Sequence, residues 1–133
     1  MSQENVELAT RVVDAFNRRD LDAFAAHCTA DVEWFPSLAG TIEGSSYTGR
    51  EGMERYFEDY DETWERLMVA NDAYRSVDDR VLACGRLDAI GRGSGVPVTT
   101  PIWTVIEFRG GKVSRARVFH DRGEAVRAAG LEE

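Results

Sequence analysis

The second half of the chain contains four segments of about ten residues that are separated by turn signals, and this pattern restricts the fold more than any other. The segments are residues 67–77, 80–92, 97–109 and 112–120, and the turns are Asp78-Asp79, Gly91 to Gly95 and Gly110-Gly111. Turns as short as these join neighbouring antiparallel strands. The pattern therefore predicts four long strands in an antiparallel meander.

The first half of the chain has the periodicity of helices. A stripe of apolar residues predicts a first helix, and its members are Val6, Ala9, Val13 and Phe16. Asp20 is a candidate N-cap for a short second helix, whose apolar face is formed by Leu21, Phe24, Ala25 and Cys28. A short strand at residues 31–35 ends before Pro36, and the Gly, Ser and Thr of residues 37–47 predict a loop.

A third helix has the clearest pattern of the three. Thr48 and Glu51 have the spacing of a capping box, and the apolar stripe that follows contains Met53, Tyr56, Phe57, Tyr60, Trp64 and Leu67. Acidic residues mostly fill the opposite face, which predicts one buried side and one solvated side. At the other end of the chain, a short C-terminal helix is expected from Glu124 to Ala129, with Gly130 as its stop.

Helices followed by a curved antiparallel sheet define an α+β fold, and 133 residues suit one domain. One face of the sheet must be buried against the helices. The other face is also rather apolar, as shown by Val81, Ala83, Gly85, Leu87 and Ala89. A chain that exposes such a face tends to cover it with a second copy, so we expect a homodimer through the sheet.

Charge and hydropathy exclude several classes of partner. The chain has 24 acidic and 16 basic residues and a net charge of −8, whereas a protein that binds the nucleic-acid backbone presents a basic surface. No apolar run approaches the roughly 18 residues of a membrane span, and the polar N-terminus does not resemble a signal peptide. The expected compartment is the cytoplasm, without nucleic-acid or membrane partners.

Motifs for metals, phosphate and nucleophilic catalysis are weak. The two His and two Cys residues lie far apart without metal-ligand spacing, and no metal or cofactor is expected. The glycine-rich run from Gly91 to Gly95 lies between two strands, which favours a turn over a phosphate loop. Cys28 and Cys84 fall in apolar segments and are interpreted as structural thiols.

Arg86 and Asp88 are the first candidate site residues. Their spacing of two places both side chains on one face of a strand, together with Leu82, Cys84 and Ile90. Charged groups on a covered sheet need partners. The two residues therefore form either a structural ion pair or part of a ligand pocket.

Asp121 is the second candidate, because it follows the last strand and shares a face with Phe119. It can cap the C-terminal helix, and a carboxylate at that place can also face a pocket. His120 points to the opposite face and is expected at the surface or the dimer face. His27 flanks an apolar stripe and is expected to be a half-buried structural residue.

The aromatic residues are numerous for a chain of this size. They form either a plain core or the wall of a cavity between the helices and the curved sheet. Tyr56 and Tyr60 share a helix face and could direct their hydroxyls inward as donors. The candidate substrate-binding residues are Phe16, Trp34, Tyr56, Tyr60, Trp103 and Phe119.

The order of elements resembles the nuclear transport factor 2-like superfamily. The resemblance is carried by two short helices, the Ala-Asp-Val-Glu-Trp-Phe-Pro strand at 30–36, the aromatic third helix and the four long strands. The sequence from Gly-Gly-Lys-Val to Ala-Ala-Gly-Leu at 110–131 resembles the SnoaL-like branch. The likeness covers residues 3–131 and implies a cone-shaped α+β barrel, usually dimeric. This fold hosts isomerases, cyclases, dehydratases, hydrolases and ligand-binding proteins.

The resemblance also implies roles for the candidate residues. SnoaL-like polyketide cyclases place an acid/base aspartate at the end of the last strand, where this chain has Asp121. Limonene epoxide hydrolase uses an Arg-x-Asp on a middle strand and a second Asp after the last strand, which Arg86, Asp88 and Asp121 match. Two carboxylates in one environment can divide acid and base roles between them.

Two departures from these relatives fall on the first strand. Limonene epoxide hydrolase holds its water with a Tyr and an Asn there, where this chain has Trp34 and Phe35. Ketosteroid isomerase places a general-base Asp before a Pro, whereas Phe35 precedes Pro36 here.

The expectation from sequence is a cofactor-free acid/base enzyme of the cyclase or isomerase type that acts on a hydrophobic cyclic molecule. Asp121 would be the general acid/base, with Arg86 and Asp88 as its charged partners. One alternative is an epoxide hydrolase that uses the same three residues, and a second is a non-catalytic ligand-binding dimer.

Overall fold

The computed structural model describes residues 2–36 and 46–131, so residues 37–45 of the predicted loop lie outside the described residues. The first half contains α1 (Ser2–Asn17), α2 (Leu21–Ala26), β1 (Cys28–Phe35), β2 (Tyr47–Thr48) and α3 (Gly49–Thr63). The second half contains β3 (Trp64–Val77), β4 (Arg80–Gly91), β5 (Pro97–Arg109), β6 (Lys112–Phe119) and α4 (Arg122–Ala128). No helix of the described ranges is long and apolar enough to cross a membrane.

The strands form one six-stranded sheet in the order β2-β1-β6-β5-β4-β3. The predicted meander of β3, β4, β5 and β6 is confirmed, since each of these strands pairs antiparallel with the next. β1 pairs parallel with β6, which makes the sheet mixed. The predicted α+β class is therefore confirmed, with β1 and β2 extending the meander at one side.

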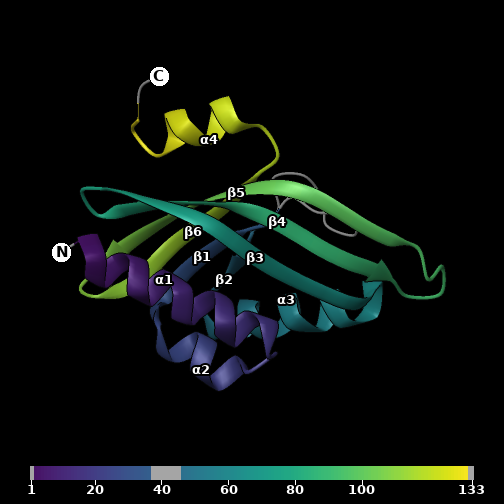
Figure 1. The fold of residues 1–133 in the computed structure, drawn as a ribbon. Helices are drawn as coiled ribbons and strands as arrows, with labels where there is room; N and C mark the ends of the chain where they lie inside the picture. The colour runs from purple at the N-terminus through teal and green to yellow at the C-terminus, as the bar shows by residue number, and fades with distance from the viewer. Residues whose placement is uncertain (1, 37–45, 132–133) are drawn as a thin grey trace.

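The helices divide between the two faces of the sheet. α1, α2 and α3 cover one face, here called the inner face, while α4 lies across the opposite, outer face (Figure 1). Asn17 fixes the end of α1 against β3: its Nδ2 donates to the carbonyl of Val69 and its Oδ1 accepts from the Val69 N–H, each at 2.9 Å. These two bonds pair α1 with an edge strand and hold the helix over the inner face.

Several element boundaries differ from the prediction. The predicted third helix is too long, because α3 ends at Thr63 and Trp64 begins β3. Cys28 begins β1 instead of continuing the stripe of α2. Thr48 makes no side-chain capping bond, so the predicted capping box does not form. Asp20 does cap α2, where its side chain accepts from the N–H of Ala23 at 3.1 Å.

The prediction of which face of β4 is covered by the helices was wrong. Val81, Ala83, Leu87 and Ala89 belong to the inner face and are at most 3% exposed. Val81, Leu87 and Ala89 pack with the aromatic side chains of α1 and α3 in the main core. The apolar face that suggested a dimer is therefore covered by the chain's own helices, since strand alternation shows two apolar faces without showing which one is inside.

The core is built around aromatic rings from α1, α2, α3 and β1. Phe16 stacks on Tyr56 with 5.6 Å between ring centroids and meets Tyr60 edge-on at the same distance. Trp34 lies 5.1 Å from Phe24 and 6.0 Å from Tyr56. Offset and edge-on contacts of this kind stabilise a core beyond the area they bury.

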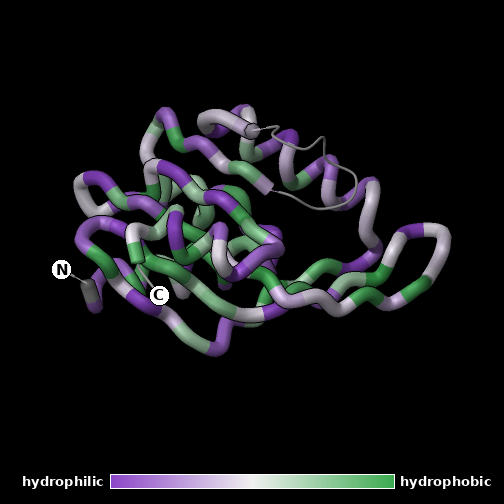
Figure 2. Tube along the Cα trace, turned by 90° about the horizontal axis from the view of Figure 1, so that it is seen from above, coloured by the Kyte–Doolittle hydropathy of each residue, from purple (hydrophilic) through white to green (hydrophobic). Residues whose placement is uncertain are grey.

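A second, smaller cluster lies on the outer face beneath α4. It consists of Leu82, Val105, Ala125, Val126 and Ala129, with Cys84, Trp103, Phe119 and Leu131 packed around it. Away from α4, the hairpin of β4 and β5 extends past the helices (Figure 1) and carries hydrophobic residues along its length (Figure 2). Val96 and Val98 on this hairpin are 57% and 39% exposed.

Candidate ligand-binding cavity

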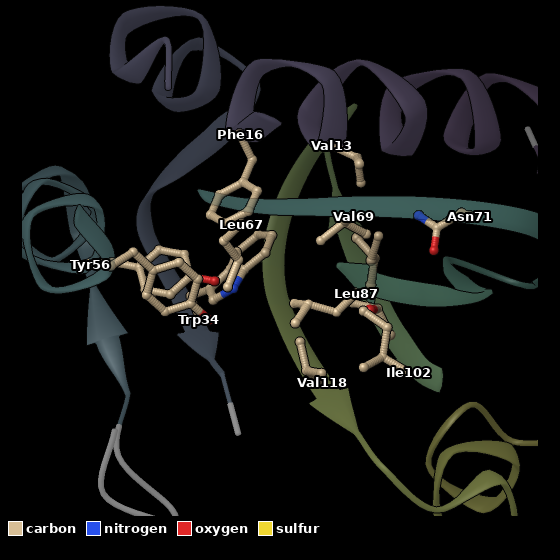
Figure 3. Close-up of a pocket in the computed structure, with 13 residues that line it drawn as sticks. Val13, Phe16, Trp34, Tyr56, Leu67, Val69, Asn71, Leu87, Ile102 and Val118 are labelled. Carbon is tan, nitrogen blue, oxygen red and sulfur yellow. The ribbon is translucent and has the colours of Figure 1, made fainter. Parts of the chain in front are cut away.

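A cavity of about 40 Å³ lies between the inner face of the sheet and helices α1 and α3 (Figure 3). A volume of this size exceeds what one water molecule needs. Its wall is formed by Val13, Phe16, Trp34, Tyr56, Tyr60, Leu67, Val69, Asn71, Leu87, Ile102, Thr104, Ile106 and Val118. The wall is mostly aliphatic and aromatic, with a few polar groups, as is typical of sites for small organic molecules.

Two polar atoms of the wall are buried and lack a hydrogen-bond partner among the described residues. One is the indole nitrogen Nε1 of Trp34, a side chain that is only 6% exposed, and the other is Oδ1 of Asn71. Burial of an unpaired donor or acceptor is unfavourable, and native structures contain few such groups. Water or a ligand in the cavity can supply a partner for Asn71 Oδ1, and the neighbouring Tyr56 hydroxyl can pair with the Trp34 indole.

The hydroxyls of Tyr56 and Tyr60 add donors beside the indole. Both side chains are almost fully buried, and their ring centroids are 4.4 Å apart. Burial raises the pKa of both phenols above the ordinary value, and the hydrogen bond between the two hydroxyls raises the pKa of Tyr60 further. Both tyrosines therefore keep their protons at physiological pH, and the donation of a hydrogen bond from them to a ligand stays a prediction.

Asn71 reaches the cavity because it continues the inner-face alternation of Leu67 and Val69, and a β-bulge in β3 follows it. Asn71 pairs with Gly85 and Ala73 pairs with Cys84, which leaves Asp72 as the extra residue. Gly85 lies between Asn71 and Ile102 on the inner face. Because Gly85 has no side chain, the amide of Asn71 can lie over it. Figure 3 shows Asn71 at the opposite end of the cavity from Trp34 and Tyr56.

The six predicted substrate-binding residues fall into two groups. Phe16, Trp34, Tyr56 and Tyr60 line the cavity. Trp103 and Phe119 do not, because they lie opposite each other on the outer face and pack against α4. Phe119 instead lines a shallower hollow on the outer face, next to Val105 and Ala128, and a role of either residue in substrate binding stays a prediction.

Arg86 and Asp88 also lie on the outer face and do not line this cavity. Nε of Arg86 donates to Asp88 Oδ2 at 3.0 Å, and the Thr99 hydroxyl donates to Asp88 Oδ1 at 2.9 Å. The two charged side chains are 51% and 41% exposed. The bond from Thr99 and the one from Arg86 both lower the pKa of the Asp88 carboxyl. The alternative reading from sequence, a structural pair that reaches water, describes them correctly.

Asp121 is the N-cap of α4. Its Oδ2 accepts from the N–H of Glu124 at 2.9 Å, and the residue is exposed. It is absent from the cavity wall. The cap predicted from the sequence is confirmed, and the second expectation, a carboxylate that also acts in a site, stays a prediction that this cavity does not support.

The histidines and cysteines lie outside the cavity wall too. His27 is half-buried and His120 is exposed, both as predicted. Cys28 is buried and its Sγ donates to the carbonyl of Phe24 at 3.3 Å. Burial raises the pKa of this thiol to about 12, so it is not a thiolate at neutral pH. Cys84 packs at the margin of the cluster beneath α4.

Asn71 and Thr104 are wall residues that the sequence analysis missed. Asn71 follows Leu67 and Val69 at steps of two, and Thr104 lies between Ile102 and Ile106 at the same step. A polar residue at an apolar position of a two-residue repeat faces the core, and this signal could have identified both.

The described wall residues include no carboxylate, imidazole, thiol, ammonium or guanidinium group. The wall can surround an apolar molecule, donate hydrogen bonds from Trp34, Tyr56 and Tyr60, and accept one at Asn71. Among the described residues no group of three His, Cys, Asp or Glu side chains could hold a metal ion. These features define a neutral cavity suited to binding a small molecule within an α+β fold.

The model of the SnoaL-like domain family matches residues 9–116, and the chain belongs to this family. No curated protein sequence matches it significantly.

Solved structures share the nuclear transport factor 2-like fold at low sequence identity. TerC, co-crystallised with polyporic acid, superposes with a TM-score of 0.79 and 18% identity over 96% of this chain and 98% of that one. A proposed polyketide cyclase from Xanthomonas campestris superposes with a TM-score of 0.77 and 20% identity over 96% of this chain and 98% of that one. A protein from Catenulispora acidiphila with a ketosteroid isomerase-like fold was solved in complex with trimethylamine. It superposes with a TM-score of 0.76 and 19% identity over 95% of this chain and 94% of that one. At these identities the likeness shows the fold.

Proposed function

We propose that this chain is a small-molecule-binding protein whose ligand occupies the cavity between the inner face of the sheet and helices α1 and α3. The ligand is a neutral, largely apolar organic molecule. Of the three functions considered from the sequence, this is the ligand-binding alternative. We favour it over an acid/base enzyme that uses Asp121.

The observation that carries the proposal is the chemistry of the cavity wall. An acid/base enzyme needs a group that can accept a proton within reach of the substrate, and the described wall residues offer no carboxylate or imidazole. Asp121, Asp88 and Arg86 lie on the other side of the sheet. An epoxide hydrolase built on these three residues has no support here, because their side chains meet solvent instead of a shared cavity.

Two solved neighbours support binding of small molecules by this fold. One was crystallised with polyporic acid and another with trimethylamine. Proteins that share a fold do not necessarily bind the same ligand. These complexes therefore support ligand binding as the class of function and do not identify the ligand of this chain.

Filling the cavity tests the proposal. Val13 faces the cavity from α1, and we expect Val13→Phe to abolish the thermal stabilisation that neutral aromatic probes give the native protein. Val96→Phe makes the same change at an exposed position of the hairpin and should preserve that stabilisation. Urea unfolding of both variants verifies that they fold. Equal stabilisation of Val13→Phe and the native protein would place the ligand elsewhere.

A cyclase or isomerase reaction is the second candidate, and the buried tyrosine pair favours it. Tyr56 and Tyr60 could donate hydrogen bonds to an oxygen that becomes negative during the reaction. Their raised pKa values keep both protons in place, so neither acts as a base at neutral pH. If such an activity is found, Tyr60→Phe should reduce kcat while Asp121→Asn leaves it unchanged.

We also propose that the chain forms a homodimer, through the outer face and the projecting hairpin. Val96 and Val98 expose apolar surface there, and exposed apolar groups tend to be covered by a partner. Sedimentation velocity should give a dimer for the native protein and a monomer for the double variant Val96→Asp, Val98→Asp. A native monomer at micromolar concentration would contradict this proposal.

A further inference from the structure

A hollow of about 190 Å³ lies on the outer face of the sheet, beside α4. It is here called the outer hollow, and its lining residues are Val105, Glu107, Arg115, Arg117, Phe119 and Ala128. These residues come from β5, β6 and the end of α4, and Figure 1 shows α4 on the side of the sheet opposite to α1. The sheet therefore separates the outer hollow from the neutral cavity beneath α1.

Two guanidinium groups of the outer hollow have free donors. Arg115 and Arg117 flank the buried Ala116 on β6, so both side chains extend to the outer face. Both are exposed, and neither forms a hydrogen bond or an ion pair with any residue that the structure describes. A guanidinium group is always charged and has five N–H donors. The two groups can therefore bind an anion without first breaking another contact.

Aromatic rings hold both guanidinium groups in place. The central carbon of the Arg115 guanidinium lies 4.8 Å from the centre of the Phe35 ring, and that of Arg117 lies 5.1 Å from the centre of the Phe119 ring. A cation–π contact of this kind restrains the cation and leaves N–H donors at the guanidinium edge for a carboxylate. Restraint before binding reduces the entropy that is lost when the anion binds.

The charges around the outer hollow favour an anion with a single negative charge. Glu107 on β5 and Glu33 on β1 lie opposite Arg115 in the strand register. Glu107 also lies 3.9 Å from Nε of Arg80, on the neighbouring strand β4. The guanidinium groups of Arg80, Arg115 and Arg117 thus outnumber the two carboxylates by one. This local excess is positive in a chain whose net charge is −8.

The remaining lining of the outer hollow is apolar. Val105, Phe119 and Ala128 supply it. An engineered protein cavity of roughly 150 Å³ can bind benzene, so the outer hollow has space for one ring. A ligand that matches both parts of the lining has an aromatic ring and one carboxylate.

We propose that the outer hollow is a second ligand site, which binds a small aromatic carboxylate through Arg115 and Arg117 with its ring against Val105 and Phe119. The site does not depend on the neutral cavity, and it goes beyond the proposed function. It lies near the Arg109 end of β5, whereas the exposed Val98 lies near the other end.

Three matched probes test the site by chemical-shift titration of the isotope-labelled full chain. Benzoate has the ring and the charge, benzyl alcohol lacks the charge, and acetate lacks the ring. Benzoate should shift the amide resonances of Glu107, Arg117 and Ala128. At these resonances it should bind about tenfold more tightly than either other probe. Equal binding of benzyl alcohol or acetate, or shifts confined to residues of the neutral cavity such as Leu87, would overturn the proposal.

Variants of matched charge assign the carboxylate to the arginines. Arg115→Gln and Arg117→Gln should each weaken benzoate binding about tenfold, because each removes donors to the carboxylate. Arg11→Gln makes the same change in charge at an exposed position of α1 and should preserve binding. Urea unfolding verifies that all three variants fold. Equal weakening in all three would indicate attraction by overall charge alone, and unchanged binding in Arg117→Gln would place benzoate elsewhere; either result contradicts the proposal.

Val13→Phe separates this site from the proposed function. The substitution fills the neutral cavity on the other side of the sheet, so it should leave benzoate binding unchanged. Loss of benzoate binding in this variant would mean that the outer hollow is not the site. Failure of neutral probes to bind would contradict the proposed function and leave the outer hollow unaffected.

Discussion

The amide of Asn71 occupies the space that a side chain on Gly85 would need. A Cβ at position 85 would lie 2.7 Å from Asn71 Oδ1, 2.6 Å from its Cα and 2.1 Å from the carbonyl oxygen of Ala70. Asn71 and Gly85 are direct partners in the ladder of β3 and β4, and the bulge in β3 follows this pair. One glycine on β4 thus determines where a polar group enters an otherwise apolar cavity.

Gly85→Ala should therefore destabilise the protein and disturb the cavity together. The added methyl group meets backbone atoms, which have little freedom to move, and we expect a loss of roughly 1–3 kcal/mol or more in the free energy of unfolding. Urea unfolding measures this loss. Gly123→Ala is the control, since its Cβ would meet nothing closer than 3.3 Å, and its stability should match that of the native protein or exceed it slightly. Equal stability of the two variants would contradict the close packing at Gly85.

Asp121 should contribute to stability and leave ligand binding unchanged. Asp121→Ala removes the cap of α4 and should cost about 1 kcal/mol, whereas Asp121→Asn keeps a capping side chain and should cost little. Thermal unfolding gives the two values. Loss of probe binding in Asp121→Asn, with stability intact, would restore Asp121 as a site residue.

The ion pair of Arg86 and Asp88 should have only a small effect on the stability of the fold. Exposed ion pairs contribute about 0–1 kcal/mol because water screens them, and both side chains are largely exposed. Asp88→Asn should leave the urea midpoint of unfolding nearly unchanged and should leave the thermal stabilisation by neutral aromatic probes unaltered. A large loss of affinity in this variant would mean that the outer face binds the ligand.

Alkaline pH should destabilise the fold through groups that keep their protons when buried. Burial raises the pKa of Cys28 from 9.0 to about 12, and burial together with the hydrogen bond to Asp59 raises that of Tyr47 from 10.0 to about 12. Both folded-state values exceed the unfolded ones, so this stabilisation is complete below pH 9 and is lost as the pH rises toward 12. Urea midpoints between pH 8 and 11 should fall. Cys28→Ala should flatten the early part of the decline, and an unchanged slope would rule out the thiol as its source.

Most of the fold could be predicted from the sequence, because it depends on local signals. Turn residues gave the meander, and Asp20 and Asp121 were identified as helix caps that the structure confirms. The end of α3 was missed because Trp64 continues the helical stripe in sequence, although the chain turns into β3 at that residue. A helix and a strand that follow each other without a loop leave no local signal at the boundary.

The site was harder to predict, because it depends on which face of the sheet the helices cover. Both faces of β4 carry apolar residues, so Arg86 and Asp88 were equally compatible with the inner and the outer side. The correct side follows from packing between distant elements, which the sequence pattern does not contain. Asn71 was within reach of prediction, since it is polar at an apolar position of the strand repeat. Its position beside Gly85 depends on the register between β3 and β4, which has no local signal in the sequence.

A crystal structure of the chain with a bound neutral aromatic probe tests the central claim most directly. We expect the probe in the cavity beneath α1, in contact with Phe16 and Leu87. A probe bound on the outer face, next to Asp121 or to Arg86 and Asp88, would contradict the assignment of the cavity as the site.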